Sequence, residues 1–148
     1  MRCVFLLKTV SPFALWMMGY CCLCMTLIQA EIIPHLPHLE LQNFAAPIRQ
    51  QVQKAYDEAR ARPRDAGASG RLAMLLQTYS QYEAAAVCYQ RTRQLEPGKW
   101  KWTYYLGTVQ AALGKHPEAA AALVEVVRRR PDYLAARLKL AESLFSMG

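Results

Sequence analysis

Three prolines recur along the chain at a fixed interval of 34 residues. They are Pro63, Pro97 and Pro131. Ala85 and Ala119, which lie between these prolines, are separated by the same interval. A period of this length is typical of arrays of helix–turn–helix units, in which each unit buries its apolar side chains only by stacking on its neighbours. The period therefore predicts an all-α fold of antiparallel helix pairs.

The first 30 residues have the composition of a targeting segment. Arg2 and Lys8 supply positive charge, and residues 9–30 contain no charged side chain. A secretory signal combines a basic start, an apolar centre and a small residue at the cleavage site, where Ala30 stands. The uncharged run is also long enough for a membrane-spanning helix, so retention as a membrane anchor is the alternative. Either fate makes the chain exported (periplasmic, secreted or lumenal) or membrane-anchored.

In the remaining chain, the cysteine content excludes an internal disulfide and the charge content indicates which partners it suits. Beyond Ala30 the only cysteine is Cys88, and one cysteine cannot form an internal disulfide. Residues 31–148 hold 16 basic side chains, since Arg2 and Lys8 account for two of the 18, and all 11 acidic ones. The resulting net charge of +5 suits an acidic partner or an anionic membrane surface.

Residues 31–47 are predicted to form a linker, because this segment contains three prolines and lacks sustained helical periodicity. Its apolar residues are expected to pack onto the first helix. His35 and His38 suggest a metal site, but no cysteine, aspartate or third histidine completes a ligand set. We therefore predict no metal site here.

Apolar residues at spacings of three and four place the helices between the prolines. A leading helix over 48–62 occupies the second-helix position of an incomplete unit. Repeats follow at about 66–99 and 100–133, and a partial repeat covers 134–148. Because the partial repeat stops where the turn between its two helices is expected, the sequence suggests a fragment of a longer repeat protein, with a terminal capping helix as the alternative.

The residues within each unit resemble those of the tetratricopeptide repeat family. One unit has the family's Leu-Gly pair, turn glycine, small residue and closing proline at Leu106-Gly107, Gly114, Ala119 and Pro131. The preceding unit matches at Ser80, Tyr82, Ala85, Tyr89 and Pro97. The resemblance covers about residues 48–148. It implies a right-handed superhelical array of antiparallel helix pairs, here preceded by an N-terminal signal or anchor helix.

The sequence departs from the family pattern in the first helices. The large aromatic residue there is Trp102, one position earlier than usual. Leu72-Ala73 and Leu140-Ala141 replace the Leu-Gly pair in the other two units. These exchanges keep a small residue at the helix contact, so they affect the detail of the packing and leave the fold unchanged.

The resemblance implies a binding surface, because the first helices of successive units in this family line a concave groove that holds a partner segment. The candidate partner-binding residues on these helices are Lys101, Tyr104, Thr108, Met74, Gln77 and Glu142. Tyr104 and Lys101 are the strongest candidates, since an aromatic anchor beside a charge is common at binding hot spots. The family members that grip chaperone C-termini use groove asparagines, and the only asparagine here, Asn43, lies outside the repeats.

Catalytic motifs are missing from the sequence. It has no phosphate-binding glycine-rich loop, no zinc-protease motif and no serine beside a histidine, and His116 is expected to be a solvated turn residue. We predict that the chain is not an enzyme, has no catalytic or metal-binding residues and needs no cofactor. Arg128, Arg129 and Arg130 are interpreted as complementing the dipole of a helix end, with an acidic-partner patch as the alternative.

The predicted function is that of a protein–protein interaction scaffold or adaptor that binds a protein or peptide partner. The positive net charge favours a partner of acidic character. A nucleic-acid-binding helical repeat is one alternative, because related arrays bind RNA. The predicted export of the chain argues against RNA binding. The repeat-bearing N-terminal part of a longer enzyme is a further alternative. A membrane is a candidate partner through residues 9–30, and the oligomeric state is left open.

Overall fold

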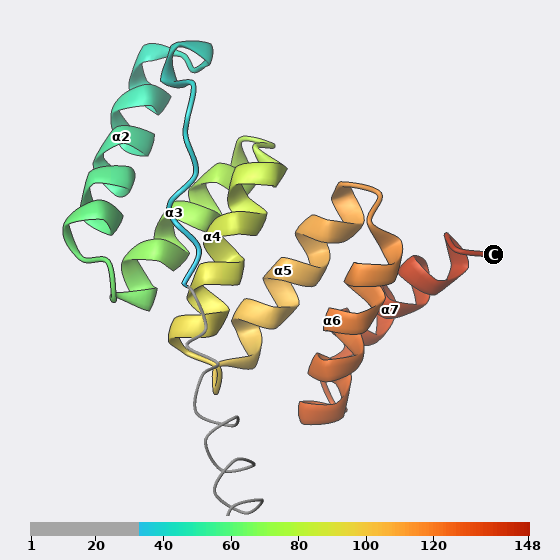
Figure 1. Ribbon diagram of the computed structural model, residues 1–148. Helices are drawn as coiled ribbons and strands as arrows, with labels where there is room; N and C mark the ends of the chain where they lie inside the picture. The colour runs from blue at the N-terminus through green and yellow to red at the C-terminus, as the bar shows by residue number, and fades with distance from the viewer. Residues whose placement is uncertain (1–32) are drawn as a thin grey trace, which may run out of the picture. The chain divides into compact units, whose positions relative to one another are not determined.

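Six α-helices make up most of the part of the chain that the computed structural model describes, residues 33–148 (Figure 1). They are α2 (Ala46–Ala61), α3 (Ala66–Thr78), α4 (Tyr82–Leu95), α5 (Trp100–Ala112), α6 (His116–Arg129) and α7 (Leu134–Phe145), preceded by the 3-10 turn η1 (Leu41–Asn43). Within residues 33–148 there is no β-strand. The signal or anchor helix expected in residues 1–30 lies outside the described residues.

The prolines set where the second helices end. In α2, α4 and α6 the last helical residue stands two positions before a proline. A proline disfavours the α conformation in the residue before it. Accordingly, the residues in between, Arg62, Glu96 and Arg130, have ψ angles of 71°, 69° and 75°. The following first helices begin at residues 66, 100 and 134, so the 34-residue period holds at both ends of these connections.

The turn within each helix pair requires a left-handed backbone at one position. Ser80 and Gly114, which are 34 residues apart, have φ angles of 57° and 72°. Glycine adopts this conformation without a steric penalty, whereas a residue with a Cβ atom does so at a cost. The first repeat therefore holds a strained serine where the second has an unstrained glycine.

Each helix packs on the helices that precede and follow it in the sequence, and the two first helices α5 and α7 also touch. The main core lies among α2, α3, α4 and α5, where Leu72, Leu76 and Val109 are fully buried. A smaller core of Leu123, Val126 and Ala136 joins α6 to α7. No helix buries its apolar side chains alone, as stacked repeats require.

Small residues allow the closest approaches between helices. A Cβ atom added to Gly107 would lie 3.0 Å from Cγ of Leu123 and 3.4 Å from the carbonyl oxygen of Ala119. A Cβ atom added to Gly70 would lie 2.5 Å from Cη2 of Trp102. The indole of Trp102 thus occupies the space above Gly70, while its N–H donates to Glu96 Oε2 at 2.9 Å. Trp102 stands one position earlier than in the family pattern, and Gly70 on α3 leaves room for its ring.

The proline-containing segment before α2 packs on the repeats. Leu36, Leu39 and Leu41 lie against the main core, and the ring of Phe44 meets that of Tyr79 edge-on, with 6.2 Å between centroids. Figure 1 shows this segment as an extended strand of chain passing beside α2 and α4. The segment supplies apolar cover that an incomplete leading unit would otherwise lack.

Arg91 of α4 ties this segment to the helices, although its side chain is only 6% exposed. Its guanidinium donates to the carbonyl oxygen of Pro34 at 2.5 Å, to Oγ of Ser69 at 3.3 Å and to the carbonyl oxygen of Pro63. These acceptors are neutral, and together they engage all three nitrogens of a buried cation. The sequence pattern did not single out Arg91.

The contact at Gly107 leads to a first prediction. Gly107→Leu is expected to lower the free energy of unfolding by about 1–3 kcal/mol, because the added atoms overpack the contact with α6. Ala119→Leu is expected to do the same from the facing helix. Thermal and urea denaturation measure both effects. The matched control is Gly98→Leu, since a Cβ atom there meets nothing within 4 Å; equal stability of all three variants would show that the contact is misplaced.

The two turns allow a reciprocal substitution. Ser80→Gly is expected to raise the free energy of unfolding by about 1 kcal/mol, because it relieves the left-handed strain of a residue with a Cβ atom. Gly114→Ser is expected to lower it by a similar amount. Urea denaturation measures the free energy of unfolding of both variants. Changes of the same sign in the two variants would contradict the turn geometry.

Candidate functional site

The structure places all six predicted binding residues on the first helices of the units. Met74 and Gln77 lie on α3, Lys101, Tyr104 and Thr108 on α5, and Glu142 on α7. Met74, Lys101 and Glu142 are exposed, whereas the other three side chains are half-buried. First helices are the elements that the sequence resemblance assigns to the binding face.

A depression of about 260 Å³ lies where α5, α6 and α7 meet. Its lining residues are Thr108, Ala111, Ala112, His116, Lys139, Glu142, Ser143 and Ser146. Two predicted binding residues, Thr108 and Glu142, are therefore brought together although they are far apart in the sequence. Met74 and Gln77 do not line this depression.

The depression offers both signs of charge and hydrogen-bonding groups. The Lys139 ammonium and the Glu142 carboxylate form an ion pair of 2.8 Å on its wall. The Thr108 hydroxyl donates to the carbonyl oxygen of Tyr105 at 2.8 Å, which leaves its lone pairs free to accept. These groups can recognise a polar main chain or side chain.

His116 differs from its expected role as a solvated turn residue. It is the first residue of α6, is half-buried and lines the depression. Its Nδ1 atom is buried and has no hydrogen-bond partner among the described residues. A histidine directly before Pro117 is a weak sequence signal, because the pattern does not reveal that α7 folds back beside the start of α6.

Tyr104 belongs to a cluster of aromatic rings where α5 meets α7. Its ring lies edge-on to that of Tyr133, with 5.1 Å between centroids, and 5.5 Å from that of Tyr105. Burial, followed by the neighbouring Tyr133, raises the pKa of the Tyr104 phenol above its ordinary value. Tyr104 therefore supports α7 with one part of its ring and presents only the remainder to solvent.

Cationic groups surround the neighbouring Trp100. The ammonium of Lys101 lies 6.0 Å from the centre of its ring, and the guanidinium carbon of Arg130 lies 5.3 Å away. Arg130 is also held by a two-pronged contact with Asp132 at 2.9 and 3.1 Å. Arg129 likewise pairs with Glu125 at 2.9 Å. Two of the three consecutive arginines thus have structural partners, whereas Lys101 is exposed and takes part in no ion pair within residues 33–148.

Gln77 on α3 is partly engaged by the fold, because its Oε1 atom accepts a hydrogen bond of 2.7 Å from the hydroxyl of Tyr89. Its amide N–H groups remain as donors. Met74, one turn earlier, is 38% exposed and supplies a flexible apolar contact. Together they extend the predicted surface onto the first complete unit.

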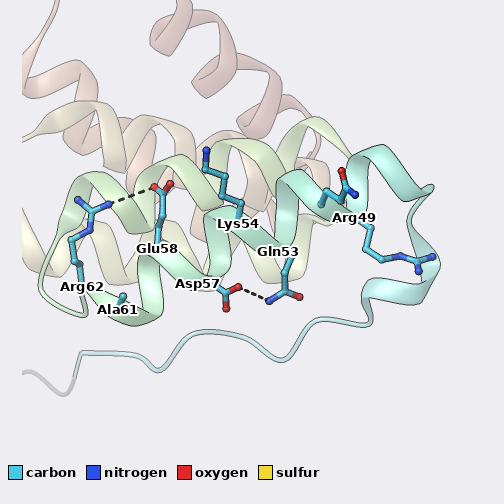
Figure 2. Close-up of a pocket in the computed structure, with 8 residues that line it drawn as sticks. Arg49, Gln53, Lys54, Asp57, Glu58, Ala61 and Arg62 are labelled. Atoms are coloured by element: carbon cyan, nitrogen blue, oxygen red, sulfur yellow. Dashed lines mark hydrogen bonds and ion pairs between the residues drawn. The ribbon is translucent and has the colours of Figure 1, made fainter.

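A hollow of about 750 Å³ lies away from the predicted residues, along α2 (Figure 2). Its side chains largely pair with one another: Gln53 donates to Asp57 at 3.0 Å, and Arg62 lies 3.6 Å from Glu58. Its lining residues lie on α2 or, in the case of Arg62, directly after its end. Binding sites usually combine groups from several elements, so we place the candidate site on the first helices.

Residues 33–148 contain no cluster of three or more side chains able to hold a metal ion. In the same range, none of the helices has the length and apolar character needed to cross a membrane. Cys88, the one cysteine there, is buried, and burial raises the pKa of its thiol to about 12. The thiol is therefore protonated at neutral pH and is a poor nucleophile.

Comparison with known proteins identifies relatives of this helical array. The model of the tetratricopeptide repeat family matches residues 71–132 and 110–148. These matches together span residues 71–148, which are 78 of the 148 residues. No curated protein matches the sequence.

Among solved structures, a mutant O-GlcNAc transferase from Thermobaculum terrenum is similar, with a TM-score of 0.58 and 25% sequence identity. The match covers 67% of this chain and 19% of the transferase chain. The chain thus corresponds to about a fifth of that protein's length.

Proposed function

The chain belongs to the tetratricopeptide repeat family, whose repeats are protein–protein interaction scaffolds, and we propose that it binds a segment of a partner protein on its first helices. The surface consists of the exposed sides of α3, α5 and α7, named here the first-helix surface. One observation carries the proposal: Thr108 and Glu142, from different units, line one depression. Such a meeting of units creates a continuous surface for an extended or helical ligand.

The charges of the first-helix surface favour an acidic partner segment. Lys101 is exposed beside Trp100, and Lys139 lies on the wall of the depression. The net charge of +5 over residues 31–148 adds a long-range attraction for acidic partners. Tyr104 and Met74 offer apolar contacts, so the proposed ligand combines acidic with aliphatic or aromatic side chains. In this proposal the chain acts by binding and performs no catalysis.

The proposed location follows from the N-terminal sequence. Residues 9–30 are uncharged and follow the basic Arg2 and Lys8, as in signals for export. We therefore place the repeats outside the cytoplasm, either released or held at the membrane. A reporter enzyme that is active only after export, fused after Gly148, is expected to be active, and deletion of residues 1–30 is expected to abolish that activity. An inactive fusion of the full chain would contradict the proposal.

Site-specific photo-crosslinking in the native host tests the first-helix surface. A crosslinking amino acid replaces Lys101 in one variant and Met74 in another, because both side chains are exposed. Both variants are expected to capture the same partner. Position 101 is preferable to position 104, since the Tyr104 ring also supports α7.

The control places the crosslinker at Val124, which is 52% exposed on the second helix α6. This position is expected to give no adduct with the partner. Capture from position 124 alone, with all three variants folded by circular dichroism, would overturn the proposed binding face.

A further inference from the structure

Arg91 is a buried cation that has no counter-charge within residues 33–148. Its side chain is 6% exposed, and its guanidinium donates to the carbonyl oxygens of Pro34 and Pro63 and to the hydroxyl of Ser69. None of the ion pairs in this part of the chain includes Arg91. A charge that leaves water loses hydration energy, and an opposite charge nearby offsets that loss. The surroundings of Arg91 therefore favour the approach of an anion.

A pocket of about 290 Å³ lies beside Arg91. Arg91 of α4 lines it together with His35 from the segment before α2, and with Tyr56 and Arg60 from α2. Figure 1 shows that segment running beside α2 and α4. The pocket thus combines groups from three parts of the chain, as binding sites usually do.

The charged side chains around this pocket are of one sign. Its lining residues include two arginines and a histidine and no acidic residue. Arg60 is exposed and takes part in no ion pair within residues 33–148. Glu58, the acidic residue closest to Arg60 in the sequence, pairs with Arg62 and Arg71 instead. An anion in the pocket therefore meets no repulsion from a lining carboxylate.

Hydrogen-bond donors remain for such an anion. A guanidinium has five N–H groups, and the contacts of Arg91 use three of them, which leaves one N–H on each of its two terminal nitrogens. Arg60 and the imidazole of His35 add further donors, and both side chains are exposed. The pocket can thus supply donors from a buried residue and from residues in contact with solvent.

Phosphate is the anion that this set of donors suits best. A phosphate monoester carries a charge of about −1.5 to −2 near neutral pH and has three terminal oxygens that accept hydrogen bonds, whereas a carboxylate carries a single charge. Guanidinium groups bind phosphate oxygens through two parallel N–H groups. We propose that this pocket, named here the Arg91 pocket, binds a phosphate group, either as free phosphate or as the headgroup of a lipid.

The Arg91 pocket is separate from the first-helix surface. Its lining residues lie on the segment before α2, on α2 or just after it, and on α4, and none of the six candidate partner-binding residues is among them. Loss of phosphate binding therefore leaves the crosslinking test from Lys101 and Met74 unaffected, and the two proposals fail independently.

Isothermal titration calorimetry of the full chain, in a neutral detergent and at constant ionic strength, tests the proposal. The probes are inorganic phosphate and dihexanoyl phosphatidic acid, a short-chain lipid whose headgroup is a phosphate monoester. Both are expected to bind at one site per chain, and acetate is expected to bind at least tenfold more weakly than the tighter of the two. Tighter binding of inorganic phosphate identifies free phosphate as the natural source, and tighter binding of the lipid identifies a headgroup.

Substitutions of arginines connect the binding to the pocket. Arg60→Gln removes a charge from the pocket and is expected to raise the dissociation constant of either probe about tenfold. Arg91→Lys keeps the charge but loses the forked arrangement of donors, and it is expected to weaken binding at least as much. Arg64→Gln is the matched control, since Arg64 is exposed and does not line the pocket, and it is expected to leave the dissociation constant unchanged.

Circular dichroism confirms that each variant is folded. Arg91 holds the segment before α2, so its substitution also affects stability. Arg60 makes no such contact, and the comparison of Arg60→Gln with Arg64→Gln therefore decides the test even where Arg91→Lys does not fold. Residues 1–30 are present in every variant, so any binding of lipid to them is the same throughout.

Glu31 is a competing source of negative charge, because it stands four residues before His35 in the sequence. Glu31→Gln is therefore titrated in the same way, and it is expected to bind both probes as the wild type does. Phosphate binding that appears only in Glu31→Gln would show that the chain's own carboxylate fills the pocket, and this result would overturn the proposal.

Three further outcomes would also overturn it. The first is a wild-type chain that binds neither inorganic phosphate nor the lipid. The second is acetate binding as tight as that of the phosphate probes, which would make the pocket a carboxylate site. The third is an equal dissociation constant for Arg60→Gln and Arg64→Gln, which would show that the binding depends on net charge and not on the pocket.

Discussion

The close approach of neighbouring helices at small residues is the constraint on which the rest of this structure depends. Gly107 lies against Leu123 and Ala119 with no room for a bulky side chain, and Gly70 gives Trp102 its place. These contacts bring α5 onto α6 and onto the preceding unit. Since each helix obtains its apolar cover from its neighbours, stability is distributed along the array and falls where a neighbour is missing.

The two ends of the array differ for this reason. At the N-terminal end, Leu36, Leu39 and Leu41 cover the leading unit, and Arg91 holds the backbone of Pro34. The far end has no comparable cover within the described residues, and Phe145 is almost fully exposed. Between the two ends of the array, the first helices present side chains that packing leaves exposed.

Periodicity in the sequence predicted the helices closely, because proline and turn residues act locally. The prolines end α2, α4 and α6, and the turn position held by Gly114 is the one that Ser80 occupies. Membership of the tetratricopeptide repeat family was likewise confirmed. The bridge from Arg91 to Pro34 spans 57 residues and was not predictable, since nothing in the local pattern marks its partner. Likewise, the position of His116 beside α7 and the second role of Tyr104 depend on how α7 packs.

Partner segments are proposed to bind on the first helices. The decisive measurement is hydrogen–deuterium exchange of the full chain with and without the partner captured by crosslinking. Exchange is expected to be slower at the exposed ends and surfaces of α3 and α5 in the complex, because bound segments restrict local opening there. Slower exchange confined to α4 and α6 would contradict binding on the first helices and would move the binding face to the second helices.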